Sequence, residues 1–131
     1  MGTHVVAEFY GLKKEKISIV EQVKPLMLEA VKLADLNKLS ETFHQFSPFG
    51  VTGVVLLSES HLSIHTWPEY NFAAIDVFTC GKEGNADHAL KVLIELFQPT
   101  HIKKKKLRRS LYGEQRIAAS LNAVRQKKNF F

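Results

Sequence analysis

The middle of the chain carries four strand-like runs with only short links between them, and this feature limits the fold most. The runs span residues 40–46, 51–57, 60–65 and 72–79. Parallel neighbours need a crossover of a dozen or more residues, so links this short favour antiparallel pairing. Residues 51–57 are almost all apolar, which predicts that this run is buried on both faces of a sheet.

Two helical patterns and two further strands flank these runs. Apolar residues recur in steps of three and four over residues 17–36, which predicts an amphipathic helix. Pro25 either kinks that helix or lies in the first turn of a helix that begins later. Residues 85–97 predict a second helix with an asparagine N-cap. Residues 5–10 predict the first strand, and the lysine-rich residues 101–109 predict a sixth strand at an exposed edge.

The predicted fold class is therefore α+β. Two helices on one face of a mainly antiparallel sheet make a two-layer α/β sandwich, which we abbreviate β-α-β-β-β-α-β in chain order. The 131 residues suit one domain with an ordinary hydrophobic content of 45%. We expect a folded body over residues 1–112 and a basic C-terminal tail over residues 113–131, with a short helix within residues 112–128.

Composition argues against a membrane protein or a secreted protein. No run of 18 apolar residues is present, so no membrane span is expected, and the N-terminus lacks the apolar core of a signal peptide. Cys80 is the only cysteine, so an intrachain disulfide is impossible and the cytoplasm is the expected compartment. No group of residues has the sequence spacing of a known metal site, so no metal is expected.

Positive charge is concentrated at the end of the chain. Ten of the 18 lysines and arginines lie after residue 100 with a single acidic residue, whereas the first 100 residues hold 8 basic and 12 acidic side chains. The run over residues 103–109 is of the kind that binds phosphate groups. Such runs more often face solvent, and no aromatic residue is interleaved here. A nucleic-acid-binding protein is thus the weaker alternative, and nucleic acid is not the expected partner.

A dense polar stretch separates two of the apolar runs. Residues 58–69 hold three serines, two histidines, two carboxylates and a tryptophan. Polar groups between buried strands need hydrogen-bond partners or a chemical role. From composition alone, a hairpin with a polar turn over residues 66–71 explains this stretch as well as a functional site does.

Sequence motifs favour the functional interpretation. SESHLSIHTWPE at residues 58–69, followed by AAIDVFTCG at residues 73–81, resembles the self-cleavage region of bacterial and archaeal S-adenosylmethionine decarboxylase proenzymes. TFHQFSPFGVTG at residues 42–53 and HVVAEFY at residues 4–10 are similar to the same family. The similarity includes the signature around the cleavage site, whereas the last third of the chain matches poorly.

The resemblance implies that the chain cleaves itself between Glu59 and Ser60. The Ser60 hydroxyl attacks the Glu59 carbonyl, and elimination of the resulting ester leaves a pyruvoyl group at residue 60, which is the covalent cofactor. Residues 1–112 are then the decarboxylase domain. The products of cleavage are a β chain of residues 1–59 and an α chain of residues 60–131.

Two further residues match the processing machinery of the family. His65 corresponds to its processing histidine, and Thr52 takes a position where members often carry serine. In a flat strand, however, Ser60 and His65 point to opposite faces and lie roughly 16 Å apart. Their cooperation therefore requires a bend, a bulge or an approach through another strand.

For turnover, the resemblance implies that the pyruvoyl group forms a Schiff base with the α-amine of S-adenosylmethionine and that Cys80 is the proton donor. Phe46 and Trp67 match the rings that stack on adenine, and Glu69 matches the carboxylate that binds the ribose. The product, decarboxylated S-adenosylmethionine, supplies spermidine and polyamine biosynthesis. A homo-oligomer of cleaved αβ protomers, a dimer, is expected. A pyruvoyl-dependent arginine or ornithine decarboxylase on the same scaffold is the alternative.

Overall fold

The computed structural model describes residues 2–81 and 85–110. Its elements are β1 (Gly2–Tyr10), α1 (Lys14–Ile17), α2 (Val20–Leu33), β2 (Lys38–Gln45), β3 (Val51–Leu57), β4 (Ser60–Trp67), the 3-10 helix η1 (Pro68–Tyr70), β5 (Phe72–Cys80), α3 (Asn85–Phe97) and β6 (His101–Arg109). The tail predicted over residues 113–131, with its short helix, lies outside the described residues. No described helix is long and apolar enough to cross a membrane.

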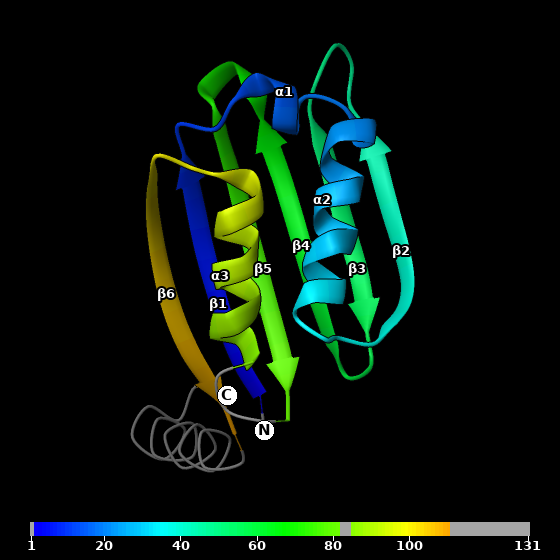
Figure 1. Cartoon of the computed structure of the whole chain (residues 1–131), viewed down its shortest axis with the longest axis vertical. Helices are drawn as coiled ribbons and strands as arrows, with labels where there is room; N and C mark the ends of the chain where they lie inside the picture. The colour runs from blue at the N-terminus through cyan, green and yellow to red at the C-terminus, as the bar shows by residue number, and fades with distance from the viewer. Residues whose placement is uncertain (1, 82–84, 111–131) are drawn as a thin grey trace, which may run out of the picture.

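All six strands form one sheet in the order β2-β3-β4-β5-β1-β6. Every pair of neighbours is antiparallel. Helices α2 and α3 lie side by side across one face of this sheet (Figure 1). The predicted α+β two-layer sandwich is confirmed, and so is β6 as an edge strand. The abbreviated order β-α-β-β-β-α-β omits one strand, because four strands separate α2 from α3.

The hydrophobic core lies between the sheet and the two helices. Alternate residues of the central strands point inward, as the period of a strand requires. Phe9, Leu62 and Ile64 from the sheet, and Met27 and Leu93 from the helices, are fully buried. Each such side chain stabilises the fold by about 1.5–3 kcal/mol relative to its exposed state.

The opposite sheet face, here called the open face, has no second layer within the described residues. Its central part is formed by His4, Val6, Glu8, Thr52, Val54, Leu56, His61, Ser63, His65, Ala74, Asp76 and Phe78. The prediction that residues 51–57 are buried on both faces is wrong. Val54 is 40% exposed and Leu56 47% exposed, because α2 and α3 cover only the other face.

Two boundaries also differ from the sequence prediction. Helix α2 begins at Val20 and not at residue 17, and of the two alternatives for Pro25 the structure has the one inside the helix. Strand β4 continues through Thr66 and Trp67, which the sequence pattern assigns to the turn over residues 66–71. Thr66 is buried because its hydroxyl accepts from the Val51 N–H at 2.9 Å and donates to Ile17 O at 2.7 Å. Those two bonds extend the strand by satisfying a polar side chain in the core.

Candidate active site

The bond predicted to be cleaved lies in the tight hairpin that joins β3 to β4, at the lower end of the sheet in Figure 1. Leu57 pairs with Ser60, so the turn consists of Ser58 and Glu59. Glu59 has a φ of 59°, in the left-handed region that glycine and asparagine adopt more readily. Such a residue costs on the order of 1–3 kcal/mol and persists only where its surroundings enforce it. The backbone is therefore strained beside the Glu59–Ser60 bond.

Cys80, at the end of β5, contacts both sides of that bond. Its backbone N–H donates to Ser60 Oγ at 3.0 Å, and its thiol donates to the carbonyl oxygen of Glu59 at 2.8 Å. A donor on a carbonyl oxygen stabilises the negative charge that develops when the carbonyl carbon is attacked. The structure thus places Cys80 against Ser60, while its role as a proton donor stays a prediction.

His65 and Thr52 form a second polar pair, on the open face near the other end of the sheet. The two residues are cross-strand partners, and Thr52 Oγ1 lies 2.9 Å from His65 Nδ1. A hydrogen bond to one ring nitrogen determines which nitrogen carries the proton and orients the imidazole. The Thr52 hydroxyl is therefore placed to orient the imidazole of His65.

The three predicted substrate contacts line one hollow beside this pair. A cavity of about 330 Å³ is bounded by Phe46, Trp67 and Glu69, and also by Thr52 and His65. Phe46 is 48% exposed and Trp67 39% exposed, so a planar ligand can reach both rings. Aromatic faces attract purines and cations, and a carboxylate accepts hydrogen bonds from hydroxyl groups. The hollow therefore suits a nucleoside that carries a positive charge.

Hydrogen bonds around Gly50 hold the loop that carries Phe46. The Phe46 N–H donates to Gly50 O at 2.8 Å, and the Gly50 N–H donates to Ser18 O at 2.9 Å. The side-chain amide of Gln45 donates to the same Gly50 carbonyl at 3.1 Å. Gly50 has a φ of 117°, which only glycine adopts readily. The loop is thereby fixed to the segment that precedes α2.

The structure separates the predicted catalytic residues into two clusters. The β3–β4 register runs without a shift from Thr52–His65 to Leu57–Ser60, so no bulge shortens the path along β4. His65 lies on the open face, whereas Ser60 pairs with the inward-pointing Leu57 at the sheet end. The spacing along the strand remains roughly 16 Å. Within one chain, His65 does not reach the Glu59–Ser60 bond.

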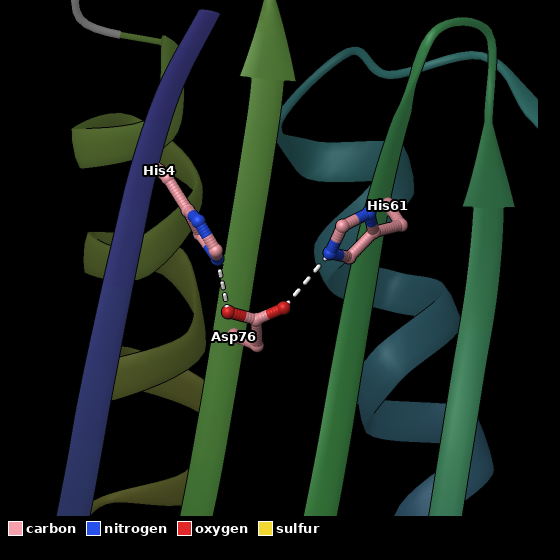
Figure 2. Close-up of side chains that lie close together, drawn as sticks. All are labelled: His4, His61 and Asp76. Atoms are coloured by element: carbon pink, nitrogen blue, oxygen red, sulfur yellow. Dashed lines mark hydrogen bonds and ion pairs between the residues drawn. The ribbon is translucent and has the colours of Figure 1, made fainter. Parts of the chain in front are cut away.

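Sequence reasoning missed a third cluster, formed by His4, His61 and Asp76 on the open face. The Nε2 atoms of both histidines meet the two oxygens of the Asp76 carboxylate, at 2.8 Å for His61 (Figure 2). Burial raises the pKa of the Asp76 carboxyl, but the hydrogen bonds from His4 and His61 outweigh it, and the pKa lies below its ordinary value. The strand period places each of the three residues on the outward side of its own strand, but only the order of β4, β5 and β1 in the sheet brings them together.

Comparisons of the sequence with known proteins point to one family. The sequence model described as S-adenosylmethionine decarboxylase matches residues 3–110. The chain is 52% identical over 105 residues to the S-adenosylmethionine decarboxylase proenzyme of Sulfurihydrogenibium sp., covering 80% of this chain and 79% of the relative. It is 49% identical over 124 residues to that of Persephonella marina, covering 95% and 93%.

Solved structures give the same result. The crystal structure of the adenosylmethionine decarboxylase from Aquifex aeolicus superposes with a TM-score of 0.81 at 43% identity, covering 85% of this chain and 92% of the other. A Trypanosoma brucei AdoMetDC monomer shares the fold with a TM-score of 0.59 at 15% identity, and the match covers 78% of this chain but 44% of that one. The match to the family's sequence model over residues 3–110 covers most of the chain and includes residues of every described strand. The chain therefore belongs to the S-adenosylmethionine decarboxylase family.

Proposed function

We propose that this chain is the proenzyme of a pyruvoyl-dependent S-adenosylmethionine decarboxylase. The observation that carries the proposal is the pair of hydrogen bonds from Cys80 to Ser60 Oγ and to the Glu59 carbonyl. These bonds hold three groups close together: the Ser60 hydroxyl as the nucleophile, the strained peptide unit of Glu59, and the Cys80 thiol that donates to the Glu59 carbonyl oxygen. The relatives compared above are named for S-adenosylmethionine, and nothing among them favours an arginine or ornithine decarboxylase.

The first reaction is self-cleavage. Ser60 Oγ attacks the carbonyl carbon of Glu59, and the bond to the Ser60 nitrogen breaks, so that an ester replaces the amide. A base carries the hydroxyl proton to the released nitrogen, and we assign this role to His65. The Cys80 thiol donates to the oxyanion. Loss of the Cα proton of residue 60 then expels Glu59 as a carboxylate, and water converts the remaining enamine into the pyruvoyl group with release of ammonia.

The second reaction is decarboxylation of the substrate. The residues fit the cofactor, since Ser60 supplies all of its carbon atoms, and the pyruvoyl group provides the electron sink for the loss of carbon dioxide. Cys80 Sγ, beside residue 60, delivers a proton to the substrate α-carbon after carbon dioxide leaves. Phe46 and Trp67 stack on the adenine, and Glu69 accepts hydrogen bonds from the ribose. The product serves polyamine synthesis.

The separation of the two clusters supports a homodimer. We infer that two chains pack their open faces together about a two-fold axis, so that Ser60 and Cys80 of one protomer meet the partner's His65. A two-fold interface brings the same pair of patches together twice, which gives two equivalent composite sites. Val54 and Leu56, at 40% and 47% exposure, are apolar side chains that such an interface buries.

Mass measurement of the intact protein tests the proposal. We expect two fragments divided at the Glu59–Ser60 bond, the larger beginning with a pyruvoyl group, and an uncut chain for Ser60→Ala. The processed protein should release carbon dioxide from S-adenosylmethionine far faster than from arginine or ornithine. A wild-type chain that stays full length, with no detectable ketone, contradicts the proposal. Faster turnover of a free amino acid contradicts the substrate assignment alone.

A further inference from the structure

The cluster of His4, His61 and Asp76 has no part in the proposed reaction. The three residues come from β1, β4 and β5, which are neighbours in the sheet. Both histidines pair in register with Phe78 on the intervening strand. Asp76 is the next residue of β5 on the same face, so the two imidazoles lean along the sheet toward one carboxylate (Figure 2). Three ligand-bearing side chains therefore converge by the geometry of the sheet itself.

The distances suit a metal ion. One nitrogen from each of the two imidazoles and one carboxylate oxygen all lie within 4.8 Å of one another, and His61 Nε2 is 2.8 Å from Asp76 Oδ2. A tetrahedral ion with bonds of about 2 Å separates its ligand atoms by roughly 3.3 Å. Small rotations of the two rings thus convert the hydrogen-bonded cluster into a coordinating one. Two imidazoles with a carboxylate are a donor set typical of zinc and other divalent transition metals.

The surroundings hold the rings and leave a path for an ion. The ring centroids of His4 and His61 each lie 5.6 Å from that of Phe78, which supports both imidazoles from the same side chain. The side chains of His4, Asp76 and His61 are 18%, 30% and 37% exposed. Asp76 also borders a hollow of about 570 Å³ on the open face. In a protomer whose open face is not covered by a partner chain, water can therefore complete the coordination shell.

The carboxylate of the cluster favours binding of a cation, whereas the guanidinium of Arg109 opposes it. Two neutral imidazoles and one carboxylate leave a single negative charge to offset the ion. Arg109 Nη1 lies 3.4 Å from His4 Nδ1, and a donor at Nδ1 keeps the ring proton on Nε2. Coordination through Nε2 needs the proton on Nδ1 instead. Binding therefore requires the guanidinium to turn from Nδ1.

We propose that His4, His61 and Asp76 form a binding site for a divalent transition-metal ion. The inference rests on the geometry of one protomer and stands whether or not the chain cleaves itself. It concerns residues with no assigned role in substrate contact or in cleavage. Because coordinating imidazoles must be unprotonated, binding weakens as the pH falls.

Titration of the purified full-length protein with Zn²⁺ after removal of metals by EDTA tests the site. Calorimetry should give one ion per chain with micromolar or tighter affinity. Co²⁺ should give the intense visible absorption of a four-coordinate nitrogen and oxygen site. His4→Ala and His61→Ala should each weaken binding at least tenfold. His88→Ala, which removes an exposed histidine on α3, is the matched control and should bind like wild type.

Three outcomes overturn the proposal. They are the absence of Zn²⁺ binding to wild type, equal binding by wild type and both cluster variants, and an equal loss in the His88 control. Circular dichroism establishes that each variant is folded. Asp76→Asn provides a further check. The substitution conserves the shape of the side chain, but an amide oxygen is a poor zinc ligand. If Asp76→Asn unfolds less cooperatively yet binds Zn²⁺ like wild type, the cluster is a hydrogen-bonded structural element and not a metal site.

Discussion

The two ends of the sheet differ in how their polar groups are satisfied. At the hairpin end, Ser60 and Glu59 both bond to Cys80, and no ligand is needed to complete that arrangement. At the other end, Phe46 and Trp67 stand 48% and 39% exposed around a hollow. A peptide bond within the chain is held in place by the fold itself, whereas a substrate that diffuses in needs accessible surface. One chain therefore carries the bond proposed to be cleaved and the proposed ligand hollow at opposite ends of the sheet.

The largest expected effect tests whether these two ends work together across a dimer. Ser60→Ala and His65→Ala should each remain uncut when produced alone. Produced together with different tags, they form mixed dimers in which one composite site has both residues intact. The His65→Ala chain should then be cleaved, and the Ser60→Ala chain should not. Mass spectrometry of the two tagged chains distinguishes them.

The matched control is a pair of differently tagged Ser60→Ala chains, which should stay uncut in every dimer. Cleavage of the His65→Ala chain when it is produced alone would show that self-cleavage does not need His65. Uncut chains in mixed dimers whose formation is shown by affinity capture would mean that the two ends do not complete each other.

The next largest effect concerns the hairpin end alone. Cys80→Ala should still process, more slowly, because it loses the donor to the Glu59 carbonyl but keeps the backbone N–H on Ser60 Oγ. Turnover should fall by about 10²–10⁴-fold, the usual contribution of a general acid. Rates of cleavage and of carbon dioxide release, measured separately, check the two parts. An unchanged turnover rate in Cys80→Ala would show that Cys80 packs in the structure but does not donate the proton.

Cys80→Ala should also change the chemical fate of the cofactor. Without a donor at the substrate α-carbon, the proton is added to the carbon derived from residue 60. Water would then release the substrate-derived portion as an aldehyde and leave its nitrogen on residue 60, which gives an N-terminal alanine and an inactive chain. Mass spectrometry of the α chain during turnover should show this product accumulating faster in Cys80→Ala than in wild type.

A smaller effect is expected at the ligand end. Trp67→Ala should raise KM, since the stacking of a base on an aromatic ring is worth about 1–3 kcal/mol, but it should leave self-cleavage intact. Tyr70→Ala is the matched control, because Tyr70 is 73% exposed and does not line the hollow. Equal KM values for Trp67→Ala and wild type would remove Trp67 from the substrate site.

Most of the fold followed from local patterns. Short links predicted the antiparallel sheet. The limits of β6 and the end of α3 at Phe97 were predicted to the residue, whereas Asn85, predicted as the N-cap, is the first residue of α3. The burial of residues 51–57 was predicted wrongly because an apolar run does not tell how many layers cover a strand. Val54 and Leu56 are exposed because both helices pack against the other face of the sheet.

The site was predictable in its parts but not in its arrangement. Family motifs pointed to Ser60, His65 and Cys80 as candidates, and the structure brings Cys80 into contact with Ser60. The cluster of His4, His61 and Asp76 joins residues that are up to 72 positions apart. Only the strand order β4-β5-β1 brings them together, and a single sequence does not supply that order.

The smallest expected effect lies between the two ends, at Asp76. Its pKa is lowered in the folded protein by the hydrogen bonds from His4 and His61, which outweigh the opposing effect of burial. A carboxyl with a lowered pKa stabilises the fold above its unfolded pKa of about 3.9, and this contribution is lost as the pH falls through the folded value. Because Asp76 is 30% exposed, we expect the contribution at pH 7 to be about 1 kcal/mol or less.

Urea unfolding in EDTA at pH 7, 5 and 3 measures this contribution for wild type and Asp76→Asn. Wild type should be the more stable at pH 7, and the difference should shrink toward pH 3, since protonation then removes the carboxylate that the variant lacks at every pH. EDTA keeps bound metal from adding to the difference. Glu29→Gln on the helix side serves as a surface control and should follow wild type at each pH. If the free energy of unfolding changes with pH in the same way for Asp76→Asn and wild type, the two hydrogen bonds to Asp76 stabilise the folded protein no more than hydrogen bonds to water do.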